Sequence, residues 1–429
     1  MRKYISTSIF ALLLALSFNY QPLWFLSFFA LLPLFAVERL GIFFLYGLVF
    51  YLAMYFPLLK ANYLITQSWF LSIVLLMVFV LSLTLLQFGL SYIFNRFIRF
   101  LPLSFVLVEI LRLYVPFDGY PFDYLGSLAA NIPTLGLSLH YITVFGWSFV
   151  ILTINWLVYK ILKENERKKY LLGLAFLFLI LGILGIVRLE SYKYQPSHLK
   201  VAVIQPFIPQ KDKLKNSLYT LPYLVYLVNQ VPKDVDLILL PETTFEEIDK
   251  YDQFFKAFKD RNFIVGVSHI IFDFDRLQLY AQNQALLVVH GKVKQVYVKR
   301  FLVPFGEYTP SYFGWLGKLI PYLDNIDYRA GDRDVIFNFR NIFFLPRICF
   351  EIAYPQRISP LVNYIVNLTN DAWFYGSWII KRHLLQAKVR AIETGRPVIF
   401  VNNNGFGGIL TPLGQYIGNP KRKILIFQL

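Results

Sequence analysis

The sequence predicts two structural classes in one chain: a helical membrane bundle of about seven helices over residues 1–192, and an α/β domain over residues 193–429. Of the 429 residues, 57% are hydrophobic and only 16% are charged, whereas soluble domains average roughly 25% charged residues. This shortage of charge is concentrated in about the first 190 residues. From about residue 196 onward charges return, and strand-like and helix-like segments alternate, which indicates one part in lipid and one in water.

The first part contains apolar runs separated by short loops, and a membrane-spanning helix needs about 20 residues. The first run begins Met1-Arg2-Lys3, as a signal peptide would. It lacks a small-residue cleavage site and another apolar run follows at once, so we expect it to be a retained helix. The seven runs cover residues 5–20, 22–37, 40–58, 69–94, 101–115, 137–162 and 170–188.

The basic residues between these runs predict the orientation of the bundle. If the N-terminus is cytoplasmic, the short outside loops hold only Lys60. Basic residues gather in cytoplasmic loops, so this asymmetry favours a cytoplasmic N-terminus. Seven crossings would then place everything after about residue 190 on the outer face, whereas six or eight would place it in the cytoplasm. The inside loops hold Arg2, Lys3, Arg39, Arg96, Arg99, Lys160, Lys163, Arg167, Lys168 and Lys169.

The formal net charge of +16 could suggest a nucleic-acid-binding protein. We do not expect a nucleic-acid partner, because membrane topology already explains many of the basic residues. The others could attract the chain to anionic phospholipid head groups. The chain has one cysteine and no cluster of His and Cys, which disfavours a disulfide scaffold or a structural zinc site. The sequence implies no metal and no organic cofactor.

Glu109 and Arg112 stand within the fifth apolar run. Charged side chains inside a membrane are costly and usually mark pairing or function. Their spacing of three residues puts them on one helix face, where they can pair. A functional site and a structural ion pair are equally open. The loop over residues 116–124 is aromatic and rich in turn residues, and we expect it at the membrane interface.

The second part begins with strand-like segments that alternate with helical ones, which predicts a sandwich of sheets and helices. His290-Gly291 separates two of these segments as a hairpin turn would. Ser377 can cap a helix that runs to Glu393 and stops at Gly395. The predicted strands cover residues 200–205, 235–240, 263–268, 286–289, 293–298, 364–368 and 398–401.

Cys349, the only cysteine, closes an apolar stretch over residues 342–349. An isolated buried cysteine is more often inert packing than chemistry. Here, however, Glu242 lies just past one apolar strand and Lys299 at the end of another. A thiol, a carboxylate and an amine at strand ends form a plausible nucleophile, base and charge stabiliser.

The loop over residues 367–374 follows a predicted strand near Cys349 and combines an Asn-Asp turn with aromatic residues. This composition suits the rim of a substrate site, although Asn and Asp also favour turns without any function. His383, on the helix after this loop, is a second candidate base for Cys349. A single histidine on a helix is more often a packing or surface residue.

Four motifs occur in the order of a known family: residues 240–243, 299–310, 348–351 and 370–374. With them, the chain resembles the bacterial apolipoprotein N-acyltransferases, multi-spanning membrane proteins that carry a nitrilase-superfamily domain. Residues 119–122, together with Glu109 and Arg112, look like the membrane-domain signature of this family. The resemblance covers essentially the whole chain.

The resemblance implies an αββα sandwich for the second domain and a catalytic triad of Glu242, Lys299 and Cys349. Glu307 and Glu351 match positions that the family needs near the active site, and we place Asn370 with them. The implied reaction acylates the N-terminal diacylglyceryl-cysteine of apolipoproteins from a phospholipid donor, through an acyl-thioester on the cysteine. The implied location is the bacterial inner membrane, with the catalytic domain on its periplasmic face and the bilayer as a partner.

The sequence departs from the family pattern at three places. Leu214 stands where the family commonly has tryptophan, and Phe400 where it often has arginine. These two departures concern substrate contacts rather than the chemistry. In addition, the sequence as far as Leu429 shows no final apolar span, so we expect the outer domain to be tethered at one end only.

An apolar segment over residues 312–323, which includes Trp315, is unlike an ordinary solvent-exposed loop. We expect it to touch the membrane interface and to gate the entry of acyl chains, the alternative being a helix packed on the domain. Trp373, Phe374 and Trp378 would line the other side of this entrance.

Two other functions fit parts of the pattern. A membrane-tethered nitrilase or amidase would use the same three residues on small amides, with water as the second nucleophile. A non-catalytic membrane scaffold or transporter would explain the bundle. It would leave the thiol, carboxylate and amine at strand ends unexplained.

Overall fold

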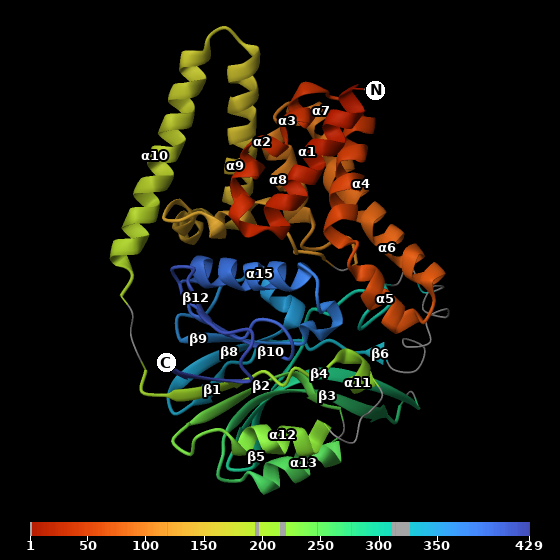
Figure 1. Cartoon of the computed structure of the whole chain (residues 1–429), viewed down its shortest axis with the longest axis vertical. Helices are drawn as coiled ribbons and strands as arrows, with labels where there is room; N and C mark the ends of the chain where they lie inside the picture. Colours follow the sequence, from red (N-terminus) through yellow and green to blue (C-terminus); the bar gives the residue numbers. More distant parts are fainter. Residues whose placement is uncertain are drawn as a thin grey trace. The chain divides into compact units, whose positions relative to one another are not determined.

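The computed structural model describes residues 2–117, 119–193, 197–214, 220–246, 248–275, 277–310, 314 and 327–429 (Figure 1). The chain divides into two compact units. The first comprises Met1–Tyr63, Gln67–Lys193 and Ile392–Gly395. The second comprises Leu64–Thr66, Tyr194–Ala391 and Arg396–Leu429.

The first unit consists of helices, as the apolar composition predicts. Besides α-helices it contains 3-10 turns and one π-helical turn, η2. The helices are α1 (Arg2–Asn19), η1 (Gln21–Leu26), α2 (Ser27–Ala30), α3 (Leu32–Ala36), α4 (Leu40–Tyr55), α5 (Leu58–Thr66), α6 (Trp69–Leu83), η2 (Thr84–Gly89), α7 (Leu90–Ile98), α8 (Leu101–Leu111), η3 (Leu125–Asn131), η4 (Leu135–Ser138), α9 (Leu139–Lys163) and α10 (Arg167–Ser191).

Within the described residues, three helical stretches are long and apolar enough to cross a membrane: Trp69–Ile98, Leu135–Lys163 and Arg167–Ser191. A fourth arises if α4 and α5, which meet at a bend of 67°, count as one broken span. The helical bundle is therefore confirmed, but this criterion finds fewer spans than the seven apolar runs.

Prolines account for part of this difference. The run over residues 22–37 becomes three short helices, and a proline stands in the first turn of η1 and of α3. Proline lacks an N–H and disfavours a helical residue before it, so it tends to begin a helix rather than continue one. Pro57 stands likewise at the bend between α4 and α5.

Glu109 and Arg112 are both buried, but within the described chain they form no ion pair with each other. Glu109 Oε1 instead accepts a hydrogen bond from the backbone N–H of Leu125 at 2.8 Å. Arg112 Nη2 donates to the carbonyl oxygen of Phe122 at 2.5 Å, and Nη1 donates to Gln87 Oε1 at 3.3 Å. The two charges thus hold the segment that follows α8, which favours the structural interpretation.

The second unit is built on two sheets. The first has the strand order β13-β1-β2-β3-β4-β5, with β6 paired to β4, and the second has the order β12-β11-β10-β9-β8-β7. The strands are β1 (Lys200–Ile204), β2 (Leu237–Phe245), β3 (Phe263–Asp273), β4 (Gln278–Val289), β5 (Lys292–Val298), β6 (Asp327–Tyr328), β7 (Phe337–Phe339), β8 (Ile342–Ile348), β9 (Tyr364–Thr369), β10 (Val398–Asn402), β11 (Gly408–Leu410), β12 (Tyr416–Gly418) and β13 (Ile424–Gln428).

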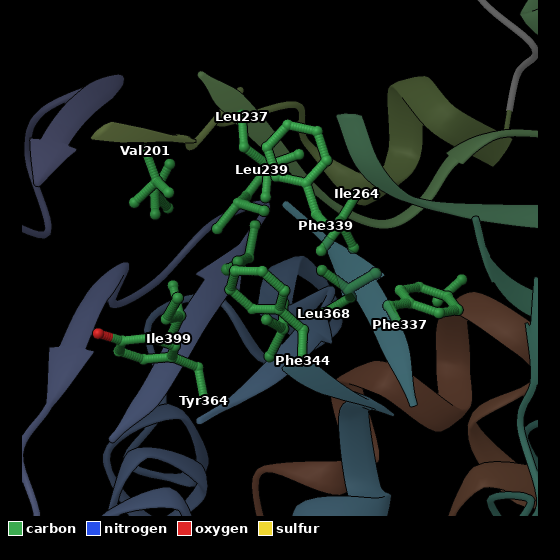
Figure 2. Packing of buried hydrophobic residues seen from close by; sticks show 14 of the residues in the cluster. Val201, Leu237, Leu239, Ile264, Phe337, Phe339, Phe344, Tyr364, Leu368 and Ile399 are labelled. Atoms are coloured by element: carbon green, nitrogen blue, oxygen red, sulfur yellow. The ribbon is translucent and has the colours of Figure 1, made fainter. Parts of the chain in front are cut away.

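The two sheets pack face to face through a shared apolar core. Figure 2 shows Val201, Leu239 and Ile264 of the first sheet against Phe344 and Ile399 of the second. Because these strands are buried on both faces, they read as nearly continuous apolar runs in the sequence.

Helices cover the outer face of each sheet. Leu227 of α12 (Thr220–Asn229) and Phe255 of α13 (Ile248–Ala257) share a core with β2 and β3. On the other sheet, Ala387 of α15 (Ile379–Thr394) packs with Ile365 and Phe400. The predicted αββα sandwich is therefore confirmed. The remaining helical turns of this unit are α11 (Gln210–Leu214), η6 (Cys349–Ala353) and η7 (Asp371–Phe374).

Two of the three predicted turn and cap signals are confirmed. His290 and Gly291 both have positive φ angles, 51° and 71°, and join β4 to β5, as a type I′ hairpin turn requires. Gly395 has φ 66° directly after α15. The capping prediction for Ser377 is wrong: α15 begins two residues later, and Ser377 Oγ has no hydrogen-bond partner among the described residues.

Candidate active site

Cys349 occupies a sharp backbone turn directly after β8. Its φ angle of 53° lies in the left-handed region, which is costly for any residue with a Cβ atom. There the strand ends and the 3-10 turn η6 begins. Ile348 and Phe350 are buried while Cys349 itself is partly exposed. A strained residue of this kind persists only where its surroundings hold it, and such residues cluster at functional sites.

Glu242 lies within β2 rather than just past a strand, which corrects the sequence-based placement. The parallel ladder between β2 and β3 is regular up to Leu240 and resumes only at Phe245. Pro241 has no N–H to donate to a ladder, which suits an irregularity at this point. Thr243, with φ 49°, is held by Lys213, whose Nζ donates to its carbonyl oxygen at 2.7 Å. Burial lowers the pKa of Lys213 to about 8.

Lys299 follows β5 directly, as predicted, and its side chain is buried between two carboxylates. Its Nζ lies 2.7 Å from Glu307 Oε1 and 3.4 Å from Glu242 Oε1. Burial alone lowers the pKa of Lys299, but Glu307 and Glu242 outweigh it and raise the pKa above its ordinary value. Lys299 is therefore an ammonium, and Glu307 belongs to its immediate surroundings.

The surroundings of Lys299 favour its charged form, whereas those of the Cys349 thiol favour its neutral form. Although Cys349 is partly exposed, the protein around the thiol shields it from water and raises its pKa well above the ordinary value, and Glu242 raises the pKa further. Lys299 and a hydrogen bond from Thr369 lower the pKa, without reversing this. The thiol is therefore protonated near neutral pH, and a nucleophilic attack by Cys349 needs a group to accept its proton.

Asn283 and Asn370 orient the carboxylate of Glu242. Asn283 Nδ2 donates to Glu242 Oε1 at 2.7 Å and to Glu307 Oε1 at 2.9 Å. The backbone N–H of Asn370, just past β9, donates to Glu242 Oε2 at 3.0 Å. Both oxygens of Glu242 thus face hydrogen-bond donors, which fix the direction of the carboxylate.

Glu351 braces the turn of Cys349 from inside the protein. Its Oε2 accepts from the backbone N–H of Ile348 at 2.8 Å. Its Oε1 accepts from Tyr297 Oη at 2.8 Å and from the backbone N–H of Arg300 at 2.7 Å. Glu351 therefore ties the residue before Cys349 to the residue after Lys299, and so keeps the two site segments together.

The predicted entrance residues lie only partly in the described chain. Trp373 and Phe374 are half-buried in η7, and Trp378 is 50% exposed. Trp315 and most of the segment over residues 312–323 lie outside the described residues, as does the side chain of Leu214. Phe400 is fully buried, so this departure from the family pattern does not lie on an accessible surface.

His383 contacts the backbone of Cys349 rather than its thiol. Its Nε2 lies 3.1 Å from the Cys349 carbonyl oxygen, and its Nδ1 lies 2.8 Å from Asp371 Oδ1. Both ring nitrogens thus face other groups, which disfavours His383 as the base for the thiol.

Asn283 is a site residue that was not predicted from the sequence. The signal was an amide just before the apolar end of β4, where a buried polar group requires partners. Among the residues that the structure describes, no group of three or more His, Cys, Asp or Glu side chains is placed to hold a metal ion.

Comparison with known proteins places the chain in a family. Residues 10–157 match the model of the apolipoprotein N-acyltransferase N-terminal domain. An apolipoprotein N-acyltransferase of Aquifex aeolicus is 36% identical over 368 residues, which cover 82% of this chain and 81% of that protein. One of Rickettsia prowazekii is 28% identical over 333 residues, 73% of this chain and 66% of the relative, so the match spans slightly under two thirds of the Rickettsia protein.

Two solved structures resemble part of the chain at low sequence identity. A CN-hydrolase superfamily protein of Xanthomonas campestris covers 53% of this chain and 89% of its own, with 16% identity and a TM-score of 0.40. A mutant amidase of the nitrilase superfamily from Nesterenkonia covers 55% and 92%, with 14% identity and a TM-score of 0.35. The sequence match to the Aquifex protein extends over most of both chains, and so this chain belongs to the apolipoprotein N-acyltransferase family.

Proposed function

We propose that this chain transfers an acyl group from a phospholipid to the N-terminal diacylglyceryl-cysteine of apolipoproteins. The observation that carries the proposal is the set of groups around Cys349. A protonated thiol stands on a strained turn, and a carboxylate and a buried ammonium both act on it electrostatically. Family membership and helices able to cross a membrane support lipid-anchored substrates.

In the first half-reaction, Cys349 Sγ attacks the ester carbonyl carbon of the phospholipid while Glu242 accepts the thiol proton. The carbonyl oxygen becomes an oxyanion, which Lys299 stabilises. Such a donor contributes roughly 2.7–4 kcal/mol in other acyl-transfer enzymes. The carbon–oxygen ester bond then breaks, the lysophospholipid leaves with the proton from Glu242, and an acyl-thioester remains on Cys349.

In the second half-reaction, the α-amine of the diacylglyceryl-cysteine attacks the thioester carbonyl carbon. Glu242 accepts a proton from the amine, and Lys299 again faces the oxyanion. The carbon–sulfur bond breaks, the thiolate of Cys349 recovers the proton, and the product is an amide. Asn283 and Asn370 keep Glu242 in one orientation through both steps.

We place the membrane domain at residues 1–192 and the catalytic domain at 193–429. The basic loops support a cytoplasmic N-terminus. With an odd number of crossings, the catalytic domain lies on the periplasmic face of the inner membrane, where lipid-anchored substrates can reach it. Trp315, Trp373, Phe374 and Trp378 would then line the entrance for acyl chains.

The intact mass of the purified protein after incubation with phospholipid and without acceptor tests this function. We expect the gain of one acyl group, mapped to Cys349 and removed by neutral hydroxylamine, which cleaves thioesters. Adding a diacylglyceryl-cysteine peptide should then remove the adduct and acylate the peptide. Absence of an adduct with several phospholipids, together with release of ammonia from small amides, would instead identify a membrane-tethered amidase.

The pH dependence of Cys349 alkylation should reveal the raised pKa of the thiol. Thiolate forms as the pH rises through this pKa, so the iodoacetamide rate should reach half its maximum above the ordinary value of about 8.5. Glu242→Gln should move the midpoint to lower pH and Lys299→Met to higher pH, because they remove opposite charges. Cys349→Ala provides the blank, since the chain has no other cysteine. A wild-type midpoint near pH 7 or below would contradict the need for a base.

A further inference from the structure

A buried histidine holds the backbone of the proposed nucleophile from behind the site. His383, on α15, lies 34 residues after Cys349 and is 3% exposed. Its Nε2 is 3.1 Å from the carbonyl oxygen of Cys349. A carbonyl oxygen can only accept a hydrogen bond, so Nε2 must carry a hydrogen and donate it.

Asp371 fixes the other side of the imidazole ring. Asp371 Oδ1 lies 2.8 Å from His383 Nδ1. Asn402 Nδ2 donates to Asp371 Oδ2 at 2.7 Å, and the backbone N–H of Asp371 donates to Asn402 Oδ1 at 3.1 Å. Burial lowers the pKa of His383, but the carboxylate of Asp371 outweighs it and raises the pKa above its ordinary value. Both ring nitrogens are therefore donors, one to a carboxylate and one to the Cys349 carbonyl.

Packing restricts the ring as well. Phe400, from β10, lies edge-to-face with His383, with ring centroids 5.1 Å apart and an angle of 82° between the planes. Residues of α15, η7 and β10 thus hold one imidazole in one orientation. The group that it reaches belongs to the one cysteine of the chain, whose φ angle of 53° requires support from its surroundings.

We propose that His383 is a positioning residue for acyl transfer. Its Nε2–H anchors the carbonyl oxygen of Cys349, keeps the left-handed turn closed and so directs Sγ at the ester carbonyl carbon. Asp371 sets the direction of the imidazole. This inference rests on the proposed function, in which Cys349 is the nucleophile. The competing interpretation is a purely structural ion pair between His383 on α15 and Asp371 on η7. The positioning role depends on the contact of Nε2 with Cys349, whereas the structural role depends on the contact of Nδ1 with Asp371.

Two substitutions separate the ring nitrogens. In His383→Gln the side-chain amide reaches the position of Nε2 and can still donate to the Cys349 carbonyl. In His383→Asn the amide reaches only the position of Nδ1 and can still donate to Asp371. The measurement is the rate of Cys349 acylation at saturating phospholipid, by intact mass, on the full-length protein beside wild type. Thermal unfolding of each variant is recorded in parallel.

We expect the asparagine variant to acylate roughly 10²-fold more slowly than wild type, the effect of a displacement of about 1 Å at a reacting group. The acylation rate of the glutamine variant should lie much closer to the wild-type rate. Thermal unfolding should show that both variants are folded. An asparagine variant at the wild-type rate, equal losses in both variants, or the reverse order would overturn the proposal. Failure of either variant to fold would also overturn it, in favour of a structural role. If wild type itself forms no adduct, the proposed function fails rather than this inference.

Discussion

Cys349→Ala is expected to abolish acyl transfer while leaving the fold intact. Without Sγ no thioester can form, and the amine would have to attack the phospholipid ester directly. In a serine protease that works through a comparable covalent intermediate, loss of the nucleophile lowers kcat on the order of 10⁶-fold. We expect no mass gain with phospholipid and no acylated peptide above the background without enzyme.

The fold should survive this change because alanine keeps the Cβ atom of cysteine, so the left-handed turn is no more strained than before. Cys349 is partly exposed, so removal of its sulfur should change the free energy of unfolding by less than about 1 kcal/mol. Cys349→Ser is the matched comparison, since it places a hydroxyl group, which is less acidic than a thiol, at the same position. An alanine variant that still acylates the peptide at a large fraction of the wild-type rate would exclude the covalent mechanism.

The proposed reacting groups could be predicted from the sequence, because strand ends can be read from local patterns. Cys349 and Lys299 each directly follow a strand. An apolar run marks β8 before Cys349, whereas β5 before Lys299 mixes lysine and glutamine with valine and tyrosine. Glu242 follows an apolar run too, but β2 continues past it to Phe245, across an interruption in its pairing with β3. The αββα layers follow from the same runs, since strands buried on both faces need a second layer on each side.

Asn370 was expected near the active site, but the contacts that orient Glu242 and Cys349 could not be predicted, because the partners come from distant positions. Asn283 is 41 residues from Glu242, and Asn370 is 128 residues from it. The sequence offers His383 as a possible base for the thiol, but the distance from His383 to the Cys349 carbonyl depends on how α15 lies on the second sheet. Such partners are fixed by the three-dimensional fold and not by local spacing.

The number of membrane-spanning helices was less predictable for a different reason. An apolar run records composition, whereas a span also needs an unbroken helix. Pro22 and Pro33 stand in the first turns of short helices inside one run, and Pro57 stands at the 67° bend between α4 and α5. Polar contacts such as those of Glu109 and Arg112 depend on the loop that returns to α8, which no periodicity reveals.

Glu242→Gln is expected to slow both half-reactions, because it removes the proton acceptor. General base catalysis contributes about 10²–10⁴-fold in enzymes, so thioester formation should fall by a factor in this range. The geometry predicts a structural cost as well. Glu242 accepts from Asn283 and Lys299 at one oxygen and from the backbone of Asn370 at the other. Either orientation of a glutamine amide places its NH₂ group against a donor, which should cost about 1–3 kcal/mol of stability.

Glu307→Gln separates the loss of a base from the loss of a charge. Glu307 also accepts from Lys299 and Asn283, and its second oxygen accepts from the backbone N–H of Val303 at 2.8 Å. Both variants therefore remove one negative charge beside Lys299 and leave one amide facing donors. If Glu242 carries the proton, its variant must be the slower in single-turnover acylation followed by intact mass. A Glu242→Gln protein that acylates at the wild-type rate, or no more slowly than Glu307→Gln, would remove Glu242 from the role of base.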